Sequence, residues 1–262
     1  MRAILFDMDG VLYNSEEPVA GARDALAWAR ERGIPYLFLT NTTSRPRRAL
    51  VEKLDRFGIP ASVDEILTPC SAAAAWLKAR VDGPVALFVR PAARVEFDGL
   101  NILPEEAEQG AAAVVVGDLG DQWDYRTLNR AFRLLHSNPR GILAALGMTR
   151  FWQAADGLRL DAGPFVAALE FATGRKAVVL GKPAREFYEA AVEKLGLPAG
   201  EIVMVGDDVE TDIAGAQGAG LKSVLVKTGK FRPADLDAPV KADAVLDSVA
   251  DLPRWWETSG TE

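Results

Sequence analysis

The chain opens with a short apolar run that ends abruptly in acidic residues, and this boundary constrains the fold most. Ala3 to Phe6 has the pattern of a strand buried on both faces, and Asp7-Met8-Asp9-Gly10 follows it directly. In open α/β sheets, ligands bind beside the carboxyl ends of the strands. Two carboxylates one residue apart raise each other's pKa unless a cation or a hydrogen-bond donor compensates them. Oxygen ligands favour a hard ion such as Mg2+. An isolated Asp-x-Asp-Gly also suits an ordinary acidic turn, so the remaining sequence has to decide.

Short apolar runs alternate with amphipathic segments along both ends of the chain. Strands are expected at 36–39, 65–69, 177–180, 202–205, 222–226 and 243–246, and helices at 18–32, 47–57, 71–81, 187–195 and 211–220. This alternation predicts an α/β fold, a doubly wound Rossmann-like parallel sheet covered by helices on both faces. Right-handed crossovers then bring the carboxyl ends of the strands to one edge.

The middle of the chain lacks the acidic motif and reads as an inserted domain. Strands are expected at 85–89, 113–116 and 141–147, helices at 124–136 and 163–173, and loop and turn at 151–160. We therefore expect a core made of residues 1–80 and 176–262, interrupted by a second α/β domain at 81–175, which is within the normal size range of domains.

The charge, the cysteine content and the lengths of the apolar runs exclude some classes of partner and location. The 262 residues carry a net charge of -7 with a pI near 5.0, which argues against nucleic acid as a partner. The single cysteine, Cys70, is expected to fill core space and fits a reducing, cytoplasmic location. The start of the chain does not resemble a signal peptide. No run approaches the roughly 18 apolar residues of a membrane span, so no membrane association is expected.

Polar side chains follow four of the predicted core strands. They are Asp7 and Asp9, then Thr40 and Asn41, then Lys182, and finally Asp207, Asp208 and Asp212. Phosphoryl transfer needs a nucleophile, a proton donor, positive charge and fixed hydrogen-bond donors. A carboxylate can serve as the nucleophile through an aspartyl phosphate. Taken singly, Thr40 and Asn41 are typical of a turn and Lys182 of a surface lysine. The acidic residues at 207–212 alone are typical of a helix start. Their appearance together, each after an apolar strand, predicts a site for a small phosphorylated substrate.

At this level of detail the sequence resembles the haloacid dehalogenase (HAD) superfamily of phosphotransferases. The carrying motifs are Asp7 to Leu12, Thr40-Asn41, Lys182 in Gly-Lys-Pro, and Gly206 to Asp212. The insertion resembles the C2-type cap. A closer resemblance, to the phospholysine phosphohistidine inorganic pyrophosphate phosphatases, is carried by residues 117–132, 158–174 and 227–235.

The resemblance implies roles for the individual residues. Asp7 would attack phosphorus and bind Mg2+, and Asp9 would act as acid and base and bind the metal through its main-chain carbonyl. Thr40, Asn41 and Lys182 would hold phosphate oxygens. Asp207 would bind Mg2+, and Asp208 and Asp212 would orient metal waters or Lys182. The cap would close over the core and choose the leaving group, with Arg150, Trp152 and Asp118 as candidates.

Other functions remain open at this point. Sugar-phosphate, nitrophenyl-phosphate and pyridoxal-phosphate phosphatases belong to the same branch, although its nitrophenyl-phosphatase members are expected to carry Asn-Pro-Asp where this chain has Asn138-Pro139-Arg140. A phospho-acceptor signalling module also groups acidic residues, a threonine and a lysine around Mg2+, but such modules are shorter and lack the insertion. A catalytically silent binding protein is a third alternative. The resemblance further implies a homodimer formed through the cap.

Overall fold

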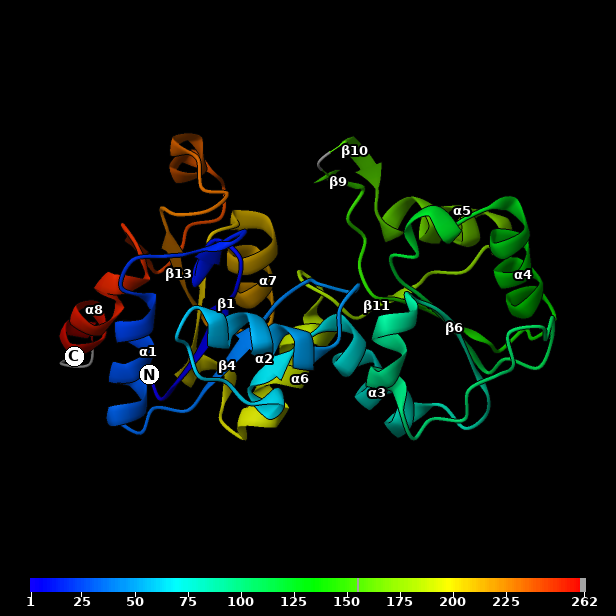
Figure 1. The fold of residues 1–262 in the computed structure, drawn as a ribbon, viewed down its shortest axis with the longest axis horizontal. Coiled ribbons are helices and arrows are strands. Elements are labelled where there is room, and N and C mark those ends of the chain that lie inside the picture. Colours follow the sequence, from blue (N-terminus) through cyan, green and yellow to red (C-terminus); the bar gives the residue numbers. More distant parts are fainter. Residues whose placement is uncertain (155, 260–262) are drawn as a thin grey trace. The chain divides into compact units, whose positions relative to one another are not determined.

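The computed structural model describes residues 1–154 and 156–259, and its contacts divide them into two units. The first unit contains residues 1–40, 47–67 and 182–259, and the second contains 41–46, 68–154 and 156–181. Both are α/β units in Figure 1. Within the described residues, no helix is long and apolar enough to cross a lipid bilayer.

A six-stranded sheet forms the centre of the first unit. Its strands, in spatial order, are β14 (Ala244–Leu246), β13 (Lys222–Val226), β12 (Ile202–Gly206), β1 (Ala3–Asp7), β4 (Tyr36–Leu39) and β5 (Ile66–Leu67). All neighbouring pairs are parallel. The chain runs outward from β1 in both directions, which confirms the predicted doubly wound arrangement.

Helices cover both faces of this sheet. They are α1 (Ala22–Glu31), α2 (Arg47–Arg56), α6 (Arg185–Leu195), α7 (Gly215–Gly218) and α8 (Leu252–Ser259). On one face Ile4 and Phe6 pack with Leu26 of α1 and Leu54 of α2 in one apolar cluster, which Leu252 of α8 also joins. Figure 1 shows α7 on the other side of the sheet from α1 and α8. Because each face is covered, the strands read as continuous apolar runs.

The second unit contains a four-stranded parallel sheet. Its spatial order is β11 (Val178–Val179), β8 (Ile142–Ala145), β7 (Ala113–Val116) and β6 (Val85–Phe88). One face packs on α3 (Pro69–Arg80), and the other packs on α4 (Tyr125–His136) and α5 (Ala162–Thr173). The local sequence predicts a helix at 71–81, and α3 is that helix. Here Cys70 and Leu77 are fully buried against this sheet, so the expectation that Cys70 fills core space is confirmed.

Two hairpins complete the description, and one of them corrects the sequence-based interpretation. Residues 151–160, expected to be loop and turn, contain the antiparallel strands β9 (Phe151–Ala154) and β10 (Gly157–Leu160). The expectation failed because both short strands are largely exposed and show no apolar run. The other hairpin, β2 (Tyr13–Asn14) with β3 (Glu17–Pro18), follows the acidic motif directly.

Short helical turns connect these elements. They are η1 (Val63–Glu65), η2 (Pro91–Phe97), η3 (Gly120–Gln122), η4 (Ala199–Glu201), η5 (Val209–Ala214), η6 (Pro233–Asp237) and η7 (Val249–Asp251). The predicted helix at 211–220 is divided between η5 and α7. That division places Asp212 inside the turn that follows β12.

Candidate active site

The register of the central strands brings the predicted polar residues to one edge of the first unit. Asp7 closes β1 and lies opposite Leu39 of β4, and Phe6 lies opposite Val205 of β12. Thr40 therefore emerges beside Asp7 on one side, and Asp207 emerges on the other. All three side chains are buried, with residue exposures of 7% or less.

Lys182 lies between two carboxylates. Its Nζ donates to Asp7 Oδ1 at 2.5 Å and to Asp212 Oδ1 at 2.7 Å. The three side chains are 4%, 10% and 1% exposed, in that order. The other oxygen of Asp212 accepts the main-chain N–H groups of Asp207 and Asp208, both at 3.2 Å. Asp212 thus fixes both the ammonium group and the start of the turn after β12.

Asp207 lies beside Asp7 and Asp212 and forms a hydrogen bond through one of its two carboxylate oxygens. Oxygens of Asp7, Asp207 and Asp212 lie within 4.8 Å of one another. Asp207 Oδ2 accepts the main-chain N–H of Lys230 at 2.6 Å. Asp207 Oδ1 is buried and has no hydrogen-bond partner among the residues that the structure describes. An unpaired buried carboxylate oxygen is costly, so this atom is a candidate ligand for a cation.

The segment 227–231, after β13, contacts Asp207 and the acidic motif, and no residue of it was assigned to the site from the sequence. Thr228 Oγ1 donates to the carbonyl of Gly10 at 2.5 Å. A Cβ on Gly10 or on Gly229 would lie 2.0 Å from Asp207 Oδ2, and both glycines have positive φ. Two signals pointed to this segment: residues 227–235 carry part of the family resemblance, and a glycine such as Gly229 marks close backbone approach.

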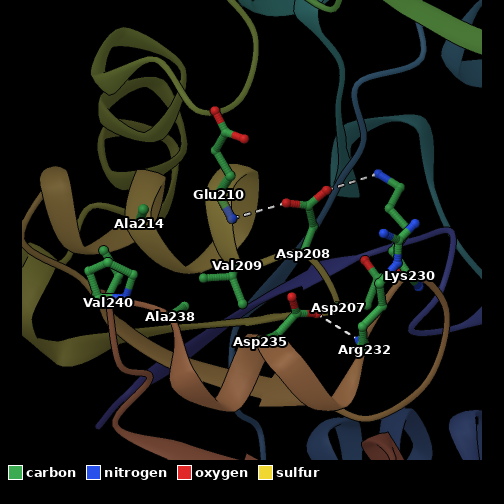
Figure 2. A pocket seen from close by; sticks show the side chains of 11 residues that line it. Asp207, Asp208, Val209, Glu210, Ala214, Lys230, Arg232, Asp235, Ala238 and Val240 are labelled. Atoms are coloured by element: carbon green, nitrogen blue, oxygen red, sulfur yellow. Dashed lines mark hydrogen bonds and ion pairs between the residues drawn. The ribbon is translucent and has the colours of Figure 1, made fainter.

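The same segment supplies a cation to the next carboxylate. Figure 2 shows the Lys230 ammonium group reaching Asp208, at 3.2 Å from Oδ2. Asp208 Oδ1 accepts the main-chain N–H groups of Glu210 and Thr211, both at 3.0 Å. Burial alone would raise the pKa of Asp208, but these N–H groups and Lys230 hold it below its usual value. Asp208 therefore caps the turn as a charged carboxylate.

Burial has the largest effect on the pKa values of Asp7 and Asp207. It raises the pKa of Asp7 to about 8, against the lowering effect of Lys182 and with a further rise from Asp212 and Asp207. Burial also raises the pKa of Asp207 to about 6, against the N–H of Lys230. For Lys182, burial lowers the pKa, but Asp212 and Asp7 outweigh it, and the net pKa is well above the ordinary lysine value.

This donor set fits a hard divalent cation. The ligand atoms are carboxylate oxygens, and Asp207 Oδ1 has no hydrogen-bond partner in the described part of the chain. Burial keeps the pKa values of Asp7 and Asp207 raised in spite of the neighbouring lysines. A cation between Asp7 and Asp207 would favour their charged forms and satisfy the unpaired oxygen.

The remaining predicted residues are placed as follows. Asp9 is exposed, and its Oδ1 accepts the main-chain N–H of Ser15 at 3.2 Å. Asn41 follows Thr40 directly in the chain and belongs to the second unit. In that unit, Asp118 and Trp152 line one pocket of about 290 Å3 together with Arg90. Arg150 does not line that pocket, and its guanidinium group lies 6.0 Å from the centre of the Phe151 ring.

Known proteins resemble this chain across both units. The family profile "Haloacid dehalogenase-like hydrolase" matches residues 4–102, and a HAD-hydrolase-like profile matches residues 179–252. The human phospholysine phosphohistidine inorganic pyrophosphate phosphatase is 37% identical over 256 residues, which cover 96% of this chain and 92% of that protein. These matches confirm the predicted superfamily and contain the first and last acidic motifs.

Solved structures agree with the sequence comparisons. A hypothetical protein from Pyrococcus horikoshii superposes with a TM-score of 0.90 at 30% identity, covering 98% of this chain and 100% of that one. A p-nitrophenyl phosphatase from Archaeoglobus fulgidus gives 0.86 at 29% identity, covering 97% and 98%. These full-length matches favour a phosphatase over the signalling module or a silent binding protein. The chain belongs to the haloacid dehalogenase-like hydrolases and is a phosphatase of that family.

Proposed function

We propose that the chain is a Mg2+-dependent phosphatase that hydrolyses small phosphorylated compounds through an aspartyl phosphate on Asp7. The observation that carries this proposal is the buried triad of Asp7, Lys182 and Asp207, in which one Asp207 oxygen has no hydrogen-bond partner within residues 1–154 and 156–259. Asp7 and Asp207 would hold the metal, together with the main-chain carbonyl of Asp9. Bound there, Mg2+ supplies positive charge that offsets the charge of the phosphoryl oxygens.

In the first half-reaction, one carboxylate oxygen of Asp7 forms a bond to phosphorus as the bond from phosphorus to the leaving group breaks. Asp9 gives its proton to the departing oxygen or nitrogen. Lys182, Thr40 and Asn41 bind the phosphoryl oxygens during the transfer. Lys182 is suited to this because it is already held at the Asp7 carboxylate by Asp212.

In the second half-reaction, the Asp9 carboxylate takes a proton from water as the water oxygen attacks phosphorus. The bond between phosphorus and Asp7 breaks, which releases phosphate and returns Asp7 to a free carboxylate. Asp208 and Asp212 act on this chemistry only through the groups they hold, which are the turn after β12 and Lys182.

The substrate proposal rests on similarity in sequence and in fold. The relative that is 37% identical is named for phospholysine, phosphohistidine and inorganic pyrophosphate, so we propose activity on P–N bonds and on pyrophosphate. The structural relatives include p-nitrophenyl phosphatases. Sugar phosphates, nitrophenyl phosphate and pyridoxal phosphate are the alternative substrates. A panel of these compounds, with phosphate release as the readout, would rank the classes.

The role of the insertion is proposed in the same way. Residues 81–175 would act as the cap that selects the leaving group, with residues 1–80 and 176–262 as the catalytic core. A homodimer formed through the cap and a cytoplasmic location complete the proposal. Sedimentation at working concentration tests the dimer, and a monomer there would remove that part.

Replacement of the nucleophile tests the mechanism. Asp7→Asn should abolish phosphate release from p-nitrophenyl phosphate with Mg2+, because an amide oxygen does not form the acyl phosphate. Asp55→Asn, at an exposed position of α2, is the matched control and should keep wild-type turnover. Turnover by Asp7→Asn at the rate of this control would overturn the assignment.

A further inference from the structure

The hairpin after the acidic motif is bonded directly to Asp9. Tyr13 and Asn14 pair with Pro18 and Glu17, which leaves Ser15 and Glu16 as the two turn residues. Ser15 adopts a left-handed conformation with φ 53°, alone among the described non-glycine residues. A left-handed residue is what a two-residue hairpin turn requires. In that conformation the Ser15 N–H donates to Asp9 Oδ1 at 3.2 Å, so a hydrogen bond links the turn to this carboxylate.

So short a hairpin needs an anchor. Two strands of two residues each have little stability of their own in water. Its main-chain bonds to the acidic motif include Gly10 N–H to the Tyr13 carbonyl at 2.6 Å and Tyr13 N–H to the Met8 carbonyl at 3.3 Å. These hold the base of the hairpin. The turn at Ser15 and Glu16 needs a separate contact.

Lys53 of α2 supplies that contact. Its Nζ lies 3.4 Å from Glu16 Oε1 and 4.1 Å from the centre of the Tyr13 ring, with the Phe57 ring at 6.0 Å. The Lys53 side chain is only 9% exposed, whereas that of Glu16 is 72% exposed. A lysine so far buried is uncommon unless it is paired. The ammonium group thus joins a buried helix position to the tip of an exposed turn.

We propose that Lys53 is a positioning residue for Asp9. Lys53 holds Glu16 and Tyr13, which fix the turn, and the Ser15 N–H then orients the Asp9 carboxylate toward the leaving group. Lys53 itself contacts no reacting atom. This inference rests on the acid role of Asp9 in the proposed function.

The chemistry of the leaving group separates positioning from general stability. Nitrophenolate is a good leaving group that departs without a proton, whereas the more basic phenolate requires one from the general acid. The value of kcat/KM covers the steps up to transfer of the phosphoryl group. The ratio of kcat/KM for p-nitrophenyl phosphate to that for phenyl phosphate therefore rises when the acid is displaced, and a uniform loss of folded enzyme leaves it unchanged.

The experiment measures this ratio in five proteins: wild type, Asp9→Asn, Lys53→Met, Glu16→Gln and Arg56→Met. Asp9→Asn should raise the ratio by about a hundredfold, because general acids contribute about 100- to 10,000-fold. Lys53→Met should raise it by about tenfold, as expected for partial loss of that contribution. Glu16→Gln changes an exposed side chain, so it tests the same contact without a risk to folding, and it should move the ratio in the same direction.

Arg56→Met is the matched control. Arg56 Nη2 lies 3.8 Å from the same Glu16 carboxylate, but its side chain is 59% exposed, so its loss should leave the ratio within about twofold of wild type. An unchanged ratio in both Lys53→Met and Glu16→Gln, with a raised ratio in Asp9→Asn, would overturn the inference alone. An unchanged ratio in Asp9→Asn would overturn the acid role of Asp9 in the proposed function, and the inference with it.

Discussion

The ammonium group of Lys182 lies 2.5 Å from Asp7 Oδ1, inside the protein, and also lies 2.7 Å from Asp212 Oδ1. This lysine therefore pairs with two of the three clustered carboxylates, and Oδ1 of the third, Asp207, has no hydrogen-bond partner among the residues described by the structure. The arrangement links stability to catalysis, because the groups proposed to hold phosphate and metal also form the buried ion pairs of this unit.

Removal of the buried cation should destabilise the protein. Lys182→Met leaves Asp7 and Asp212 without their ion-pair partner, and loss of one member of a buried pair costs about 3–5 kcal/mol. Urea unfolding in EDTA at about pH 8 measures the change. The cost should shrink at lower pH, where Asp7, with its pKa of about 8, takes up a proton.

Lys222→Met is the control for that experiment. Lys222 begins β13 and is exposed, so its replacement should change the free energy of unfolding by less than about 0.5 kcal/mol. If Lys182→Met is no more destabilising than Lys222→Met, the buried pairing does not contribute to stability.

The raised carboxyl pKa values predict how stability depends on pH without metal. A carboxyl group whose pKa is higher in the folded protein contributes stability that is complete below its unfolded pKa and is lost as pH rises through the folded pKa. For Asp207 this window runs from about 3.8 to about 6, and for Asp7 it extends to about 8. In EDTA, the free energy of unfolding should fall from about pH 5 to about pH 8, with Asp207 alone contributing about 1–2 kcal/mol.

Saturating Mg2+ should oppose this trend, because metal binds the deprotonated carboxylates and its stabilising effect grows as they lose their protons. The measurement is a series of urea titrations at several pH values, each with EDTA and with Mg2+. A wild-type curve in EDTA that rises between about pH 5 and about pH 8 would contradict the assignment of raised pKa values to this cluster.

Gly229 provides a test of the segment that approaches Asp207. A Cβ at this position would lie 2.0 Å from Asp207 Oδ2 and 2.4 Å from Gly10 Cα, so Gly229→Ala has to move the carboxylate. Displacement of a group that supports a metal ligand typically costs about 10- to 100-fold in metal affinity. The Mg2+ concentration for half-maximal activity should therefore rise by about tenfold or more.

Gly33→Ala separates backbone strain from this collision. Gly33 has φ 64°, close to the 61° of Gly229, but no atom of the residues that the structure covers lies within 4 Å of its Cβ position. Both variants should lose about 1–2 kcal/mol from the left-handed conformation, and only Gly229→Ala should require more Mg2+. Equal Mg2+ requirements in the two variants would show that the segment does not support the metal site.

The parallel core could be predicted because its strands are buried on both faces. Such strands appear as apolar runs, and each of β1, β4 and β12 is followed by the polar residues that meet at the edge. Sequence order and the handedness of crossovers were then sufficient to bring Asp7, Thr40 and Asp207 to one edge.

The parts that were missed depend on contacts between distant segments. The strand pairs β2–β3 and β9–β10 have strands of two and four residues with mostly exposed side chains, which are too short for an apolar pattern to identify them. The approach of Gly229 to Asp207, and the contact of Lys53 with Glu16, join segments that are 22 and 37 residues apart. Nothing in either local sequence specifies its partner.

Trapping the phosphorylated enzyme tests the central claim most directly. Asp9→Asn should slow hydrolysis of the aspartyl phosphate, while p-nitrophenyl phosphate still donates its phosphoryl group because its leaving group needs no proton. Rapid quenching, reduction with borohydride and peptide mass spectrometry locate the acyl phosphate, since reduction converts a phosphorylated aspartate to homoserine. We predict homoserine at position 7 and at no other aspartate. Substrate turnover without modification at position 7, or with homoserine at another position, would contradict the account.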